Sequence, residues 1–178
     1  MTKPEQYRLL ERQVAALLEG ETDPIAKMAN LAAVLHETFG FWWTGFYRVV
    51  PVAPVAPVAS AASVDPVVPS ASVGEPVEPP SPSELVLGPF QGPVACMYIP
   101  YGKGVCGTAW KRNETVVVPD VEQFPGHIAC SSASRSEIVV PVHRPDGTVT
   151  AVLDIDSDRL ATFDDVDKEW LERIVAIL

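Results

Sequence analysis

A proline-rich tract in the first half of the chain places the strongest constraint on the fold. Residues 51–83 contain nine of the eighteen prolines, and Val, Ala and Ser make up most of the rest. Proline cannot donate a backbone hydrogen bond, and this near-repeat of Val, Ala and Pro has neither a helical nor an alternating period. We therefore expect a polyproline-II-like or disordered insertion between two strands, with one compact domain of about 145 residues around it.

Two helices are predicted before the tract. Apolar residues recur at helical spacing over residues 7–18 and 25–35, and a glycine follows each run as a stop signal. Asp23 and Pro24 are typical of an N-cap and a first helical position, so the second helix should begin there.

Most of the remaining pattern is that of β-strands. Runs of β-branched and aromatic residues predict strands at residues 41–50, 85–90, 94–99, 115–118, 138–142 and 148–155. Residues 144–147 are a strong hairpin turn signal between the last two strands. A short helix is predicted at residues 105–111, and Thr162 should cap a closing helix over residues 163–178. This order of elements predicts an α+β domain with a mainly antiparallel sheet.

Composition excludes several classes of function. The formal net charge is -10 and the pI about 4.6, with no basic stripe, so binding to a nucleic-acid backbone is not expected. The N-terminus does not resemble a signal peptide, and no run of eighteen apolar residues occurs, so we expect a cytoplasmic protein. In a reducing compartment the three cysteines should be reactive or simply buried, rather than structural disulfides.

Three carboxylates near the C-terminal hairpin are candidates for acid chemistry. Asp154 and Asp156 stand two apart on a strand and share a face, where like charges raise one pKa and leave a carboxylic acid able to donate a proton. The alternative is that this strand has simply reached water. An ideal hairpin register places Glu137 opposite Ile155, on the other face, so a shared cluster requires a bulge or a Glu137 outside the strand.

The cysteines differ in their predicted settings. Cys130 lies three residues after His127 in a predicted loop of about sixteen residues, residues 120–135, where an exposed thiol can become a thiolate. Cys96, on an apolar strand, and Cys106, on a helix of small residues, are each typical of core cysteines. His127 and the three cysteines lack the close cysteine pair of structural zinc sites, so we expect no metal.

The combination of these motifs resembles the free methionine-(R)-sulfoxide reductases, single-domain enzymes of the GAF fold. The matching stretches are Trp43 to Tyr47, Leu85 to Gly92 with Ala95-Cys96, Gly102 to Ala109, Gly126 to Cys130, Ser136 to Ile138 and Leu153 to Ser157. The resemblance implies one GAF-like domain over residues 1–178, interrupted by the proline tract, with the N- and C-terminal helices packed on one face of a central sheet.

The resemblance also implies an oxidoreductase that acts on free L-methionine-(R)-sulfoxide. The cysteine that matches Cys130 attacks the sulfoxide sulfur and becomes a sulfenic acid. The one that matches Cys96 resolves it as a disulfide, and the one that matches Cys106 is able to take part. Thioredoxin then restores the thiols, so no bound cofactor is expected.

The substrate should be held by the acids and by an aromatic side chain. Carboxylates of Glu137, Asp154 and Asp156 suit an ammonium group and can supply the proton, and Trp43 can pack against the substrate methyl. The alternative for Trp43 is an ordinary core residue. The alternative function is a non-catalytic GAF module that binds a small ligand or senses oxidants. A homodimer is common in this fold and is an expected assembly.

Overall fold

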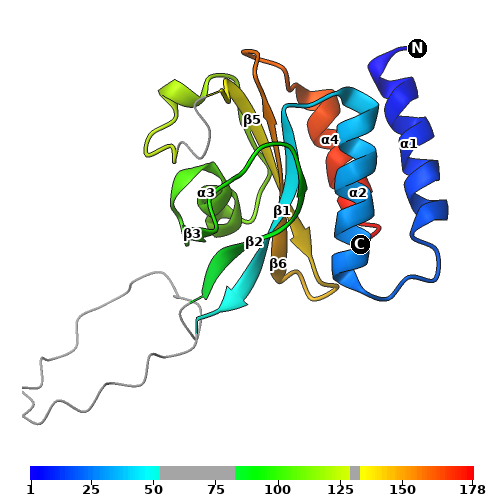
Figure 1. Cartoon of the computed structure of the whole chain (residues 1–178), viewed down its shortest axis with the longest axis horizontal. Helices are drawn as coiled ribbons and strands as arrows, with labels where there is room; N and C mark the ends of the chain where they lie inside the picture. Colours follow the sequence, from blue (N-terminus) through cyan, green and yellow to red (C-terminus); the bar gives the residue numbers. More distant parts are fainter. Residues whose placement is uncertain (53–82, 129–132) are drawn as a thin grey trace, which may run out of the picture.

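The computed structural model describes residues 1–52, 83–128 and 133–178 (Figure 1). Most of the proline-rich tract therefore lies outside the described residues. Its two ends are described: Pro51 closes strand β1 (Trp43–Pro51), Ser83 opens strand β2 (Ser83–Gln91), and the two residues pair in antiparallel register. The prediction that the tract separates two strands is confirmed, and these strands are direct neighbours.

Both predicted N-terminal helices are present, and the second begins where its cap predicts. Helix α1 spans Lys3–Leu17 and helix α2 spans Pro24–Phe39. The Asp23 carboxylate accepts hydrogen bonds from the backbone N–H groups of Ile25 and Ala26, which have no partner within the helix. Helix α2 ends at Gly40, whose φ of 64° is left-handed and unstrained only for glycine.

A six-stranded sheet forms the centre of the domain, in the order β3-β2-β1-β6-β5-β4, and every neighbouring pair is antiparallel. The remaining strands are β3 (Tyr98–Pro100), β4 (Val116–Val118), β5 (Ser136–His143) and β6 (Val149–Ser157). The predicted strand at residues 94–99 is shorter and later than expected, because only its last residues pair with β2.

The two faces of this sheet carry different layers. Helices α1, α2 and α4 (Asp165–Val175) cover one face, and helix α3 (Gly104–Arg112) lies on the other (Figure 1). Strand alternation sends Leu153 and Ile155 of β6 into the core beneath the three helices, and Val152 into the core on the α3 side. The predicted α+β class, with the terminal helices on one face, is confirmed.

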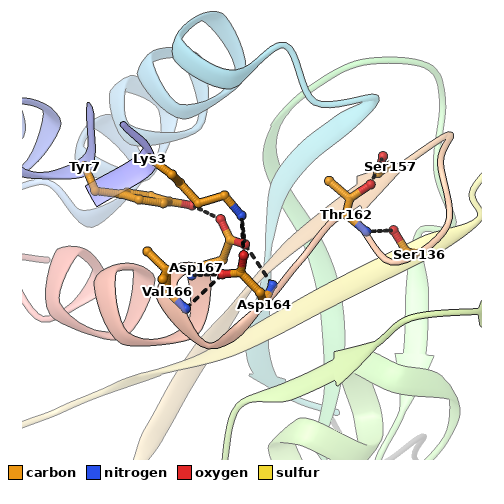
Figure 2. Close-up of polar contacts among 8 residues, drawn as sticks. All are labelled: Lys3, Tyr7, Ser136, Ser157, Thr162, Asp164, Val166 and Asp167. Carbon is orange, nitrogen blue, oxygen red and sulfur yellow. Dashed lines mark hydrogen bonds and ion pairs between the residues drawn. The ribbon is translucent and has the colours of Figure 1, made fainter. Parts of the chain in front are cut away.

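The start of the closing helix differs from the prediction. Asp164, not Thr162, is the N-cap of α4, and its carboxylate accepts from the backbone N–H groups of Val166 and Asp167. The Thr162 hydroxyl instead donates to Ser157 Oγ, at the end of β6 (Figure 2). Both residues are good N-caps, so the sequence could not separate them; the chain turn after β6 selected the later one.

The loop predicted at residues 120–135 contains a 3₁₀ turn, Val121–Gln123, capped by the Asp120 carboxylate. Residues 129–132 within this loop lie outside the described part of the chain. In the described part, no helix is both long and apolar enough to cross a membrane.

Candidate active site

A one-residue bulge in the β5–β6 hairpin brings the predicted acids together. His143 pairs with Val149, but the next pair is Val142 with Ala151, so Thr150 is the extra residue. From there the register runs on to Glu137 opposite Asp156 instead of Ile155. The prediction that a shared cluster requires a bulge is confirmed, and the bulge sits close to the turn.

The same strand ends are anchored next to the acids. Ser136 Oγ donates to the carbonyl oxygen of Arg159 at 2.6 Å. It also accepts from the backbone N–H of Thr162, as Figure 2 shows. Ser136 and Ser157 pair across β5 and β6, one residue beyond Glu137 and Asp156. This network holds both strand ends, and with them the acids, at a defined position.

A cavity opens between α3 and the sheet at this point. It encloses about 530 Å³ of empty space, part of it open to solvent. Its described lining residues are Trp43, Tyr47, Val94, Ala95, Ile99, Gly104, Val105, Cys106, His127, Ile128, Ser134, Glu137, Asp154 and Asp156. All three predicted acids, Trp43 and Cys106 therefore share one cavity.

The three carboxyl groups occupy an environment that disfavours their charge. Glu137 and Asp154 are only 5% and 6% exposed. Burial, followed by the neighbouring carboxylates, raises the pKa of both well above the usual values. Burial also raises the pKa of Asp156 to about 6, although a hydrogen bond from Ser134 Oγ opposes the rise. At neutral pH the cluster holds protons that exposed carboxyl groups would release.

No described residue that lines the cavity is a lysine or an arginine. His127 is the basic group present, with Nε2 3.8 Å from Glu137 Oε2. Burial lowers the pKa of His127, so its imidazole is neutral at neutral pH. In addition, Asp154 Oδ1 is buried without a hydrogen-bond partner among the described residues. The described lining of the cavity is thus rich in acidic groups and contains no lysine or arginine to compensate them.

Helix α3 brings Cys106 against these acids. The Sγ atom lies 3.9 Å from Glu137 Oε1, and the side chain is buried. Burial and the charges of Asp154 and Glu137 raise the pKa of the thiol, so it is protonated at neutral pH. The start of α3 can lie close to the end of β3 because residue 107 is glycine: a Cβ there would lie 2.5 Å from the carbonyl oxygen of Pro100.

Aromatic rings from β1, the strand that pairs with β6, line the cavity beside the acids. Trp43 and Tyr47 have ring centroids 6.0 Å apart. Trp43 Nε1 donates to the carbonyl oxygen of Pro93, and the Tyr47 hydroxyl donates to that of Cys96, both at 3.0 Å. Gly45 leaves room for the Trp43 ring, since a Cβ there would lie 2.4 Å from it. Trp43 is both buried and part of the cavity wall.

The other two cysteines, Cys96 and Cys130, are not among the described residues that line the cavity. Cys130 lies outside the described residues. Cys96 lies in the segment before β3, not on a strand as predicted, and it is half-buried and disulfide-bonded. Sequence reasoning did not single out Tyr47 or Ser134 as site residues. Tyr47 shares the strand face of Trp43, which was a usable signal, whereas Ser134 follows a stretch without any period.

Comparison with known proteins agrees with this geometry. The GAF domain family matches residues 23–178. The chain is 45% identical to GAF domain-containing protein A of Dictyostelium discoideum over 99% of this chain and 92% of that protein. It is 39% identical to the free methionine-R-sulfoxide reductase of Escherichia coli over 100% and 89% of the two chains.

A solved structure covers almost the whole domain. The free methionine-R-sulfoxide reductase of Neisseria meningitidis, in complex with its substrate, superposes with a TM-score of 0.78 at 44% identity, over 99% of this chain and 88% of that one. The family match covers most of the chain, and the named relatives match it along nearly their full length. The chain therefore belongs to the GAF domain family and, within it, to the free methionine-R-sulfoxide reductases.

Proposed function

We propose that this protein reduces free L-methionine-(R)-sulfoxide to L-methionine by thiol chemistry. One observation carries the proposal: buried Glu137 and Asp154 and half-buried Asp156 line one cavity without a described lysine or arginine. A free amino acid brings an α-ammonium group that compensates this charge. A methionine within a polypeptide brings a neutral amide instead, so the cavity favours the free amino acid.

Different side chains of the cavity bind the two ends of the substrate. The carboxylates hold the ammonium group, and the rings of Trp43 and Tyr47 pack against the methyl end of the side chain. A sulfoxide oxygen leaves readily only when it is protonated. Glu137 and Asp154, whose pKa values are raised by burial, keep a carboxylic acid available for that proton at neutral pH.

The redox steps then balance through two cysteines. Cys130 attacks the sulfoxide sulfur, which gains two electrons and becomes the thioether of methionine, while Cys130 takes the oxygen as a sulfenic acid. The thiol of Cys96 displaces that oxygen as water and forms a disulfide with Cys130. A thioredoxin dithiol reduces this disulfide by two thiol exchanges and is itself oxidised. No bound cofactor takes part.

The cysteine environments support this division of roles. Cys96 is disulfide-bonded, whereas Cys106 is a free thiol buried against Glu137. The protonated state of Cys106 makes it a weak nucleophile, so it serves the reaction as a third thiol at most. Thioredoxin as the reductant and a homodimer as the assembly remain predictions.

Methionine release from separate R and S epimers of free methionine sulfoxide tests the proposal. Reduced protein is supplied with thioredoxin, thioredoxin reductase and NADPH. We expect turnover of the R epimer alone, and Cys130→Ser should release no methionine even in a single turnover. No turnover of either epimer by folded, reduced protein would instead favour a ligand-binding or redox-sensing GAF module.

A further inference from the structure

A mixed thiol and carboxylate cluster at the cavity floor has the composition of a metal site. One side-chain ligand atom from each of Cys106, Glu137 and Asp154 lies within 4.8 Å of the other two, and all three residues are buried. They come from three different elements, α3, β5 and β6. Because the sheet and the packed helix fix these elements, the cluster is held in place by the fold and not by a surface loop.

The distances come near those of a tetrahedral ion. At a tetrahedral angle, a zinc–sulfur bond of about 2.3 Å and a zinc–oxygen bond of about 2.0 Å place the two ligand atoms about 3.5 Å apart. Cys106 Sγ and Glu137 Oε1 are 3.9 Å apart. The third ligand is also available, because Asp154 Oδ1 is buried without a hydrogen-bond partner among the described residues. Rotation of its carboxylate closes the set.

A nitrogen ligand lies at the edge of the cluster. His127 Nε2 is 3.8 Å from Glu137 Oε2, and the ring lines the same cavity. One sulfur, one nitrogen and two oxygens are a borderline-soft donor set, which suits Zn²⁺ and not Mg²⁺ or Ca²⁺, which prefer oxygen ligands alone. This ligand set differs from the one considered in the sequence, which was His127 with the three cysteines. That set was rejected because it has no close pair of cysteines, and it shares only Cys106 and His127 with the present one.

We propose that the cavity floor is a zinc-binding site formed by Cys106, Glu137 and Asp154, with His127 as the fourth ligand, and that zinc and the substrate exclude each other there. A divalent cation supplies the positive charge that the described lining lacks, as the substrate's ammonium group does. Binding releases the Cys106 thiol proton and the protons that Glu137 and Asp154 hold to solvent, and it changes no oxidation state. Metal binding itself does not depend on the proposed function; only the exclusion of substrate rests on it.

Cobalt provides the test, because a thiolate bound to tetrahedral Co²⁺ gives a near-ultraviolet charge-transfer band. The full chain is titrated with Co²⁺ in its disulfide-oxidised form, so that Cys106 is the free thiol, and Zn²⁺ is then added. We expect one equivalent of Co²⁺ to produce the band and Zn²⁺ to abolish it. Cobalt binding without the band, or no binding, overturns the proposal.

Variants assign the ligands. Cys106→Ser should abolish the band, and Asp154→Asn should weaken cobalt binding at least tenfold, whereas Glu169→Gln, an exposed acid on α4, should change neither. Circular dichroism checks that each variant folds. Because Cys106 is buried, Cys106→Ala serves as a second variant if Cys106→Ser does not fold. A band that survives in a folded Cys106 variant overturns the proposal.

Competition separates this proposal from the reductase function. L-methionine-(R)-sulfoxide should raise the apparent Kd for Co²⁺ at least tenfold. The S epimer chelates free metal equally well and should not do so. Cobalt binding without selective competition contradicts the exclusion and the placement of the substrate, while the metal site stands. Turnover of the R epimer without cobalt binding leaves the reductase proposal intact and removes the metal site.

Discussion

Buried acids occur on both faces of the sheet, but among the described residues only one face pairs its buried acid with a lysine. On the helical face, Asp167 is 2% exposed and accepts hydrogen bonds from Tyr7 Oη at 2.8 Å and Lys3 Nζ at 2.6 Å (Figure 2). On the α3 face, Glu137 and Asp154 are as buried and face no described lysine or arginine. Asp167 ties helix α1 to helix α4, whereas the proposed function assigns the other acids to the binding of an incoming cation.

This difference is a physical criterion for function. A buried carboxylate without a cation destabilises the fold, so a chain keeps such a group where another requirement outweighs stability. A buried carboxylate with a full set of donors is explained by the fold alone. Burial by itself does not distinguish the two cases; the partners do.

The sharpest test of this contrast removes one acid from the cavity. Asp154→Asn leaves the shape of the side chain but removes its acidic proton and its ability to ionise, so kcat/KM for L-methionine-(R)-sulfoxide should fall at least 100-fold, a loss of about 3 kcal/mol of transition-state stabilisation. Steady-state kinetics at pH 7.5 in the presence of EDTA measures the loss. Stability should not fall, because a destabilising group is removed. A variant with unchanged kinetics would remove Asp154 from the site.

The matched change on the helical face should lower stability and leave activity nearly unchanged. Asp167→Asn leaves the Lys3 ammonium group without its buried partner, so the free energy of unfolding should fall by about 2 to 4 kcal/mol. Urea denaturation measures this loss. The KM for the sulfoxide should stay within twofold of that of the wild type, because the residue lies across the sheet from the cavity. A large change in KM with little loss of stability would contradict the contrast.

The pH dependence of stability should reveal the acids that lack a cation. The folded-state pKa of Asp156 is about 6, above the ordinary value of 3.8, so the folded protein retains a proton that the unfolded chain releases. The contribution of Asp156 to stability is therefore fully present below about pH 4 and is lost as pH rises through 6. Asp156→Asn should abolish this loss. The stability difference between the variant and the wild type should therefore favour the variant by about 2 to 3 kcal/mol more at pH 8 than at pH 4. Urea denaturation at both pH values, in EDTA, gives this difference, and equal values at the two pH values would contradict the assignment.

The smallest expected effect concerns the serine that lines the cavity. Ser134 donates to Asp156, a bond that lowers the pKa of that carboxyl. Ser134→Ala should raise this pKa further and shift the acidic limb of the pH profile of kcat/KM upward by less than about one pH unit, with a fall of less than about twofold at pH 7. Ser134→Thr keeps the hydroxyl and should restore the profile. An unchanged limb in Ser134→Ala would show that this bond does not tune Asp156.

The sequence was sufficient wherever a local rule governs the structure. Strand alternation placed Asp154 and Asp156 on one face, and Asp23 with Pro24 marked the start of α2. The same rules failed where two local choices are nearly equal. Thr162 and Asp164 are both good caps, and the sequence chose the wrong one. The helical pattern also did not identify Asp167 as a buried residue. An acid is typical of a solvent-exposed position, and only the contacts with Lys3 and Tyr7 show that this one is buried.

The sequence by itself therefore determined the class of the fold, the position of the proline tract between two strands, and the residue types available for chemistry. Only the tertiary structure decided that Glu137 joins the aspartates, because one extra residue at Thr150 shifts a register that sequence period cannot reveal. It also decided that Cys106 meets these acids, and that no described lysine or arginine does. Charge compensation depends on contacts between distant segments, and those exist only once the chain has folded.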